Sequence, residues 1–243
     1  MNDFAVRIAS GCLSLFMVIG VMVPSGHAAP VDSARDIFKT AYENRYTWDN
    51  QFPGYQAEVS VNYSGALEQG LVRVKPDLSI ETFNLENEEI EQIVRSELQM
   101  EIIHRRNLPF DEVHPQSTFE IVGADDDGAL EIQELGDDVE SRYKVRDRKI
   151  VQVNRGLDDV AVTVNTLGWI TPQAGYLPVH YQTIFRNPHT GEVIQREDIR
   201  DFHEKIGNYY LLTKRGIRYG DKLGPKEKPL ADIWIRFNDI QPL

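Results

Sequence analysis

The sequence has little cysteine, few basic residues relative to acidic ones, and no catalytic signature. Its 243 residues include 1 cysteine, and 26 Lys and Arg stand against 38 Asp and Glu, for a net charge of −12. This balance argues against a nucleic-acid partner, because phosphate contacts require a basic surface. With 41% hydrophobic residues the chain is also too apolar to be disordered.

Residues 1–28 are expected to be a secretory signal peptide. Arg7 supplies the basic segment, and Ile8–Val23 is an apolar core shorter than the ~20 residues that span a bilayer. Small residues in Gly26-His27-Ala28 predict cleavage directly after this tripeptide. The remaining chain, 29–243, contains no cysteine, which excludes disulfides and thiol catalysis. The expected location is the periplasm, with the lumen of an internal membrane as the alternative, since the same kind of signal leads to both.

Two amphipathic helices are predicted, over residues 33–46 and 86–106. In both, apolar side chains recur at helical spacing. The second has acidic residues in its first turn and His104, Arg105 and Arg106 in its last, which suits the helix dipole.

Most of the rest is predicted to be β-structure. Residues 55–63 give the clearest strand, because apolar and polar side chains alternate with a period of two. The other candidate strands are 67–75, 78–83, 119–122, 129–135, 140–145, 150–154, 159–167, 179–187, 192–203, 209–218 and 232–238. Short strands separated by turns predict one α+β domain over residues 29–243. The regular spacing of the strands indicates an antiparallel meander that forms a sandwich, a barrel or a curved open sheet.

The acidic segment 123–134 partly matches a calcium-binding loop. Asp125, Asp127, Gly128 and Glu134 fit the pattern, but its first position is a glycine and the flanks read as strands. An acidic hairpin turn is therefore expected, with weak calcium binding as the alternative.

Asp201 and His203 lie two residues apart on one predicted strand face. A metal or acid–base role is conceivable for such a pair. Since no second histidine-rich segment accompanies it, the pair is expected on a polar face toward solvent. With no nucleophile elbow, phosphate-binding loop or zinc-protease motif, no metal, cofactor or catalytic residue is predicted, and the protein is not expected to be an enzyme.

Apolar side chains spaced by two or four recur along many of the strands. They indicate either an ordinary core or a partly covered concave face that holds a lipid or an acyl chain. The residues expected to line such a cavity are Val59, Val61, Val72, Val74, Val162, Trp169, Phe185, Tyr209 and Leu211.

Three stretches carry a resemblance to a known fold. They are the first helix leading into strand 55–63, the segment Gly70-Leu71-Val72-Arg73-Val74-Lys75-Pro76, and the late hairpin from Gly175-Tyr176-Leu177-Pro178 to Gly207-Asn208-Tyr209-Tyr210. Together they resemble the periplasmic lipoprotein-carrier family of LolA-like half-barrels. That resemblance implies a half-barrel, a curved antiparallel sheet of about ten strands with two covering helices over its concave side. It does not imply lipoprotein transport, since fold does not fix function.

A second resemblance covers nearly all of the chain after the predicted signal. Tyr46-Thr47-Trp48-Asp49 and Phe52-Pro53-Gly54-Tyr55 resemble the signature of an exported domain-of-unknown-function family from photosynthetic bacteria.

The leading functional prediction is non-enzymatic, extracytoplasmic binding of a hydrophobic ligand, either a lipid or an acylated polypeptide, by a monomer. A membrane-associated protein is a further candidate partner. The alternatives are a structural or assembly factor with a filled core, and a hydrolase whose carboxylates come from distant strands.

Overall fold

The computed structural model describes residues 32–136, 141–157, 159–220 and 232–243; the predicted signal peptide lies outside them. Three helices are α1 (Ala34–Glu43), α2 (Glu88–Arg105) and α3 (Phe110–Val113). The strands are β1 (Tyr55–Tyr63), β2 (Ala66–Val74), β3 (Ile80–Phe83), β4 (Thr118–Ala124), β5 (Leu130–Leu135), β6 (Ser141–Arg146), β7 (Lys149–Leu157), β8 (Val160–Ile170), β9 (Leu177–Arg186), β10 (Val193–Ile206), β11 (Tyr209–Tyr219) and β12 (Ile233–Pro242). Within the described residues, no helix is long and apolar enough to cross a membrane.

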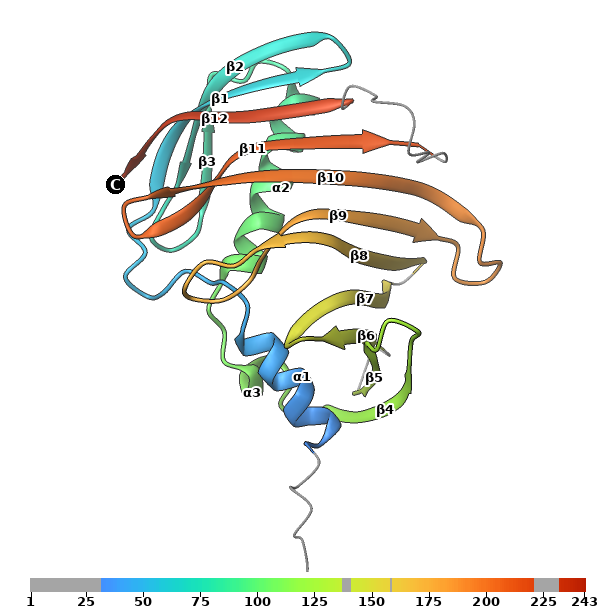
Figure 1. Cartoon of the computed structure of the whole chain (residues 1–243). Coiled ribbons are helices and arrows are strands. Elements are labelled where there is room, and N and C mark those ends of the chain that lie inside the picture. Colours follow the sequence, from blue (N-terminus) through green and yellow to red (C-terminus); the bar gives the residue numbers. More distant parts are fainter. Residues whose placement is uncertain (1–31, 137–140, 158, 221–231) are drawn as a thin grey trace, which may run out of the picture. The chain divides into compact units, whose positions relative to one another are not determined.

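All twelve strands form one antiparallel sheet in the order β3-β2-β1-β12-β11-β10-β9-β8-β7-β6-β5-β4 (Figure 1). The pairing of β1 with β12 joins the first meander to the last strand, and β3 and β4 are left at the two ends, so the sheet is open. The predicted number of about ten strands is too low. The predicted two helices omit α3, whose four residues are too few for a periodic pattern.

Local sequence explains where the two long helices begin. Ser33 caps α1 in a reciprocal capping box with Asp36. The Asn87 side chain accepts hydrogen bonds from the first backbone N–H groups of α2, and three glutamates in that first turn suit the helix dipole.

The helices divide the sheet into an inner face, on which they pack, and an outer face. On the inner face, α2 meets β1, β2, β10, β11 and β12 in a cluster that we call the large core (Figure 1). The buried stripe of α2 consists of Ile90, Val94, Leu98 and Ile102, each four residues from the next.

A second cluster, the small core, lies under α1 and α3 at the β4–β7 end of the sheet. It is rich in aromatic rings, with Phe38 of α1 4.2 Å from the Tyr143 ring and 5.9 Å from that of Phe110. Ile132 and Val145 complete its floor on β5 and β6.

The signature segment 46–55 closes one end of the large core. Trp48 and Phe52 stack with their ring centroids 4.1 Å apart. The Trp48 indole donates to the Tyr210 carbonyl at 3.2 Å, and the Tyr210 backbone N–H donates to the Tyr46 hydroxyl at 2.7 Å. This segment therefore ties α1 to the β10–β11 hairpin, although 160 residues separate them in sequence.

Candidate functional site

Most of the predicted ligand-binding residues on β1, β2 and β11 lie in the large core. Val59, Val61, Val72, Val74 and Leu211 are at most 2% exposed and pack in the cluster that α2 completes. On β1, β2 and β11, α2 therefore occupies the space where the ligand cavity was predicted.

The other predicted residues are half-buried. Tyr209 packs on the ring of Phe52 and donates its hydroxyl to Asp49 at 2.7 Å. Trp169 lies near a lysine, with Lys149 Nζ 5.1 Å from its ring centroid.

Val162 and Phe185 face each other on β8 and β9, on the inner face between the two cores. With Val164 they form what we call the inner strip. These three side chains are half-buried and belong to neither core cluster. The strip is therefore an apolar stretch of the inner face outside the two clusters onto which the described helices pack.

Polar groups border the inner strip on the β9–β10 side. Thr183, which lies opposite Val164, is buried, and the Tyr181 hydroxyl donates to Asp201 at 3.2 Å. Glu197 lies opposite Thr183, and burial raises the pKa of this carboxyl above its ordinary value. A ligand on the strip would thus meet apolar side chains with a few polar groups at one margin, the usual composition of a small-molecule site.

Beneath α2 lies a cluster of buried charges, which we call the ionic cluster. Arg215 of β11 binds Asp201 through two nitrogens at 2.7 and 2.6 Å and reaches Glu97 of α2 at 2.8 Å. Glu101 of α2 accepts from Arg105 at 2.8 Å, and His203 Nε2 lies 3.1 Å from the same carboxylate. The side chains of Glu101, Asp201 and Arg215 are each 2% exposed, and that of His203 is fully buried. These contacts bind α2 to β10 and β11.

The prediction that Asp201 and His203 face solvent is wrong. The strand alternates as predicted, but its polar side points under α2, where Arg215 and Glu101 supply counter-charges. Sequence reasoning missed Glu101 and Arg215. One signal for a buried charge was available: Glu101 lies three residues after Leu98, on the apolar stripe of α2, where a charged side chain needs a partner.

The ionic cluster is poorly suited to acid–base or metal chemistry. Burial alone would raise the pKa of Glu101, but Arg105, His203 and Arg215 outweigh it and hold that pKa below its usual range. Ligand atoms of Glu101, Asp201 and His203 lie within 4.8 Å of one another, a spacing that could hold a metal ion. Because guanidinium groups already occupy their carboxylate oxygens, a cation there would have to displace Arg215.

The small core holds a second polar network. His114 Nδ1 lies 2.5 Å from Glu134 Oε1, and the Tyr143 hydroxyl donates to Glu134 Oε2 at 2.7 Å. Burial tends to raise the pKa of Glu134, yet hydrogen bonds from His114, Ser117 and Tyr143 lower it to about 2. Through this network, His114, which directly follows α3, is held against β5 and β6.

The acidic segment 123–134 forms the predicted hairpin between β4 and β5. Asp125 accepts from the backbone N–H groups of Asp127 and Ala129, and Gly128 has a φ of +80°, which favours glycine. Lys144 Nζ binds the second oxygen of Asp125 at 3.0 Å, so a lysine ammonium already neutralises this carboxylate.

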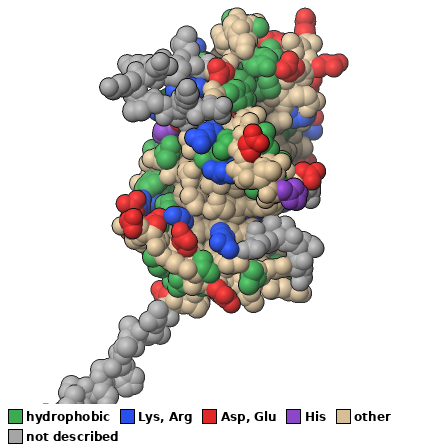
Figure 2. Space-filling view, turned by 90° about the vertical axis from the view of Figure 1, so that its right-hand side faces the viewer, with side chains coloured by type: hydrophobic (Ala, Val, Ile, Leu, Met, Phe, Trp, Pro, Cys, Tyr) green, Lys and Arg blue, Asp and Glu red, His purple; other side chains and the backbone are tan. Residues whose placement is uncertain are grey.

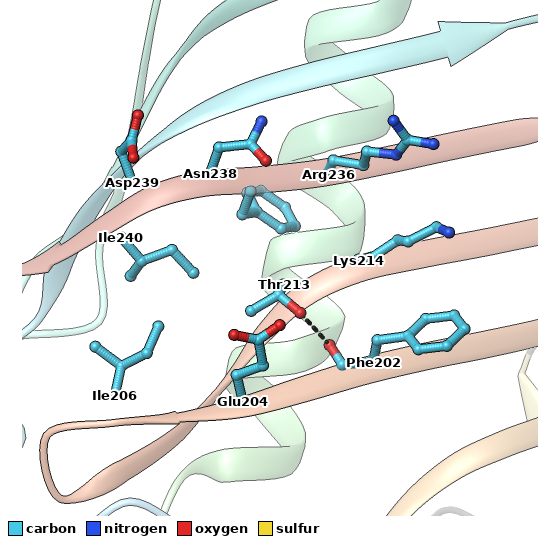
Figure 3. A pocket seen from close by; sticks show the side chains of 10 residues that line it. Phe202, Glu204, Ile206, Thr213, Lys214, Arg236, Asn238, Asp239 and Ile240 are labelled. Carbon is cyan, nitrogen blue, oxygen red and sulfur yellow. Dashed lines mark hydrogen bonds between the residues drawn. The ribbon is translucent and has the colours of Figure 1, made fainter.

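A hollow of about 480 Å³ lies where β11 and β12 separate (Figure 3). Their pairing ends at Lys214 opposite Arg236, after which β12 pairs with β1 alone. Ile206, Ile240 and the exposed Phe202 contribute its apolar lining, and charged side chains make up much of the rest. This hollow was not predicted, because the alternation of side chains along a strand does not show where two adjacent strands separate.

The protein thus belongs to the class of open antiparallel sheets with helices on one face. Its distinguishing features are the apolar inner strip between the two cores and the buried ionic cluster. Residues 29–243 match the family described as Protein of unknown function (DUF3386), and the chain belongs to it. Neither the curated proteins nor the solved structures gave a match.

Proposed function

We propose that this protein binds a hydrophobic ligand, a lipid or an acyl chain, on the inner strip and performs no catalysis. The observation that carries this proposal is that Val162, Val164 and Phe185 are apolar, half-buried and outside both cores. Each buried CH₂ of a chain laid on them would contribute about 0.8 kcal/mol. This site is smaller than the predicted cavity, since α2 occupies the β1, β2 and β11 part.

The proposal includes export of the protein and a half-barrel of the lipoprotein-carrier kind. The family match begins at residue 29, directly after the predicted cleavage position. The open sheet with its helices on the inner face agrees with a half-barrel. Location in the periplasm or in a photosynthetic lumen is part of the proposal.

Native mass spectrometry of the protein from its own host, with organic extraction, tests ligand binding directly. A stoichiometric lipid adduct is expected, together with uptake of a fluorescent fatty acid by the delipidated protein. The double variant Val162→Ser/Phe185→Ser should weaken that uptake by about tenfold or more, since lost apolar contacts cost about 1–3 kcal/mol each.

The matched control is Leu167→Ser, which changes an exposed side chain of the same strand and should leave uptake unchanged. A clean apo mass with no fatty-acid uptake would contradict ligand binding. It would favour the second candidate, an assembly factor whose helices fill the sheet, which the complete burial of Val59, Val61 and Leu211 against α2 supports.

A further inference from the structure

The outer face of β9–β12 concentrates basic side chains in a chain whose net charge is −12. Successive side chains of a strand point to opposite faces of a sheet. Four buried residues of β10 and β11 point inward: Ile199, Asp201, Arg215 and Ile217. Their neighbours in sequence therefore point outward. The outward basic side chains, which we call the basic patch, are Arg186, Arg196, Arg200, Lys214, Arg218 and Arg236.

Acidic groups on the patch are too few to neutralise it. Among the described outward residues of segments 180–186, 196–202, 214–218 and 234–236, Asp198 is the one carboxylate. It is shared by His180, Arg200 and Arg218 at 3.0, 3.5 and 3.9 Å.

Within the described part of the chain, the patch cations are otherwise weakly paired. Arg186 donates to the neutral Thr163 hydroxyl at 3.1 Å. The Nε atoms of Arg196 and Arg218 are buried without a hydrogen-bond partner in the described part of the chain.

Glu204 and Asp239 line the hollow beside Lys214 and Arg236 and offset part of this charge. With Asp198, three described carboxylates stand against six basic side chains, so the patch keeps a net positive charge.

Aromatic rings lie among these cations. Phe202, Lys214 and Arg236 are directly opposite one another on three neighbouring strands (Figure 3). Phe202 is 49% exposed, and Lys214 Nζ lies 5.0 Å from its ring centroid and 4.1 Å from that of Trp234. Trp234 lies flat over Gly216, where any Cβ would come within 2.7 Å of the indole.

We propose that the basic patch docks the protein on an anionic lipid bilayer. Lys and Arg are attracted to acidic headgroups, while aromatic rings prefer the headgroup level of a bilayer, so cations interleaved with Phe202 and Trp234 suit this surface. The negative charge elsewhere opposes docking weakly, because it is screened beyond about 8 Å at physiological salt. This inference goes beyond ligand binding and does not depend on it.

The test is co-sedimentation of the whole protein with phosphatidylglycerol–phosphatidylcholine vesicles, with pure phosphatidylcholine as the neutral surface. Binding is expected on the anionic vesicles only and should fall steeply with added salt. Arg200→Glu/Lys214→Glu/Arg236→Glu should lower the partition coefficient at least about tenfold, because each basic side chain at such a surface contributes a several-fold factor.

The matched control is Arg106→Glu/Arg148→Glu/Arg35→Glu, which makes the same charge change away from the patch and should leave most of the binding intact. Circular dichroism checks the fold of both triple variants. Equal binding by the patch variant and the wild type, or no preference for anionic vesicles, would overturn the proposal.

Patch-dependent binding of poly-glutamate without vesicle binding would also overturn it, in favour of an acidic protein partner. Fatty-acid uptake should be normal in the patch variant. Failure of docking and failure of ligand binding are therefore separate results.

Discussion

The two cores use different means to hold a helix on the same sheet face. In the large core, α2 contributes 18 residues, an aliphatic stripe and two carboxylates that enter the ionic cluster. In the small core, α1 contributes 10 residues and aromatic contacts, and its charged contacts are solvent-accessible: Arg35 and Lys39 both bind Asp111, which is 62% exposed. Exposed pairs contribute little, whereas breaking a buried pair is costly, so α2 should be held much more firmly than α1.

The largest expected effect comes from removing the central cation of the large core. Arg215→Met leaves Asp201, Glu97 and Glu101 without their shared guanidinium, and the free energy of unfolding should fall by about 3–5 kcal/mol. Urea unfolding followed by circular dichroism measures it. The control, Arg95→Met, removes a half-exposed cation on α2 and should cost under about 1 kcal/mol. A similar loss in both variants would contradict the special role of the ionic cluster.

The aliphatic stripe of α2 should rank next. Leu98 is fully buried, so Leu98→Ala leaves a cavity and should lower the free energy of unfolding by about 2–5 kcal/mol. Met100, on the same helix, is 49% exposed, and Met100→Ala should change it by no more than about 0.5 kcal/mol. A small effect at Leu98 would mean that the large core collapses easily around the missing side chain.

Acidification should act on the small core through Glu134. Its pKa falls from an ordinary value of 4.5 to about 2 in the folded protein, so its contribution to stability is fully present above pH 4.5. That contribution is lost as the pH falls toward 2. At neutral pH, Glu134→Gln should cost about 1–3 kcal/mol, and the difference from wild type should shrink in urea titrations at successively lower pH. A difference that stays constant with pH would exclude this linkage.

The smallest effect is expected at the exposed pairs of α1. Lys39→Ala removes one solvent-exposed contact to Asp111 and should leave the urea midpoint of global unfolding unchanged within error. Native-state hydrogen exchange should nevertheless show α1 amides exchanging faster than those of α2, and faster still in the variant. Equal protection of the two helices would remove the distinction between the cores.

The surface gives a second contrast, between net charge and its distribution. Figure 2 shows one side of the molecule with basic, acidic and hydrophobic side chains interspersed. The net charge of −12 by itself disfavours an anionic surface as a partner, yet the register of four strands gathers six basic side chains on one face. The net charge does not record where the charged side chains lie. A charged partner at the surface responds mainly to the charges within about 8 Å, because salt screens those farther away.

Much of the fold followed from local patterns. Each of the twelve strands corresponds to a predicted range, because alternation with a period of two is a local signal. The two long helices were predicted because their apolar spacing is also a local signal, and each predicted end lies one to three residues beyond the observed one. The one-turn helix α3 was missed because it has no period.

By itself, the sequence determined the strand and helix pattern, the antiparallel class and the acidic hairpin at Asp125–Gly128, since each depends on neighbours within a few residues. That the sheet is open follows from its tertiary structure, because β1 pairs with β12 and leaves β3 and β4 at the two ends. Only the tertiary structure decided which apolar strand residues a helix would cover. Val59 and Val162 carry the same alternating signal, yet one lies under α2 and the other between the cores. It also turned Asp201 and His203 inward, because Glu101, 102 residues before His203, and Arg215 of the next strand supply the counter-charges that make their burial tolerable. Long-range packing, which no local period encodes, decides which part of the inner face α2 covers and which part, the inner strip, lies outside both cores.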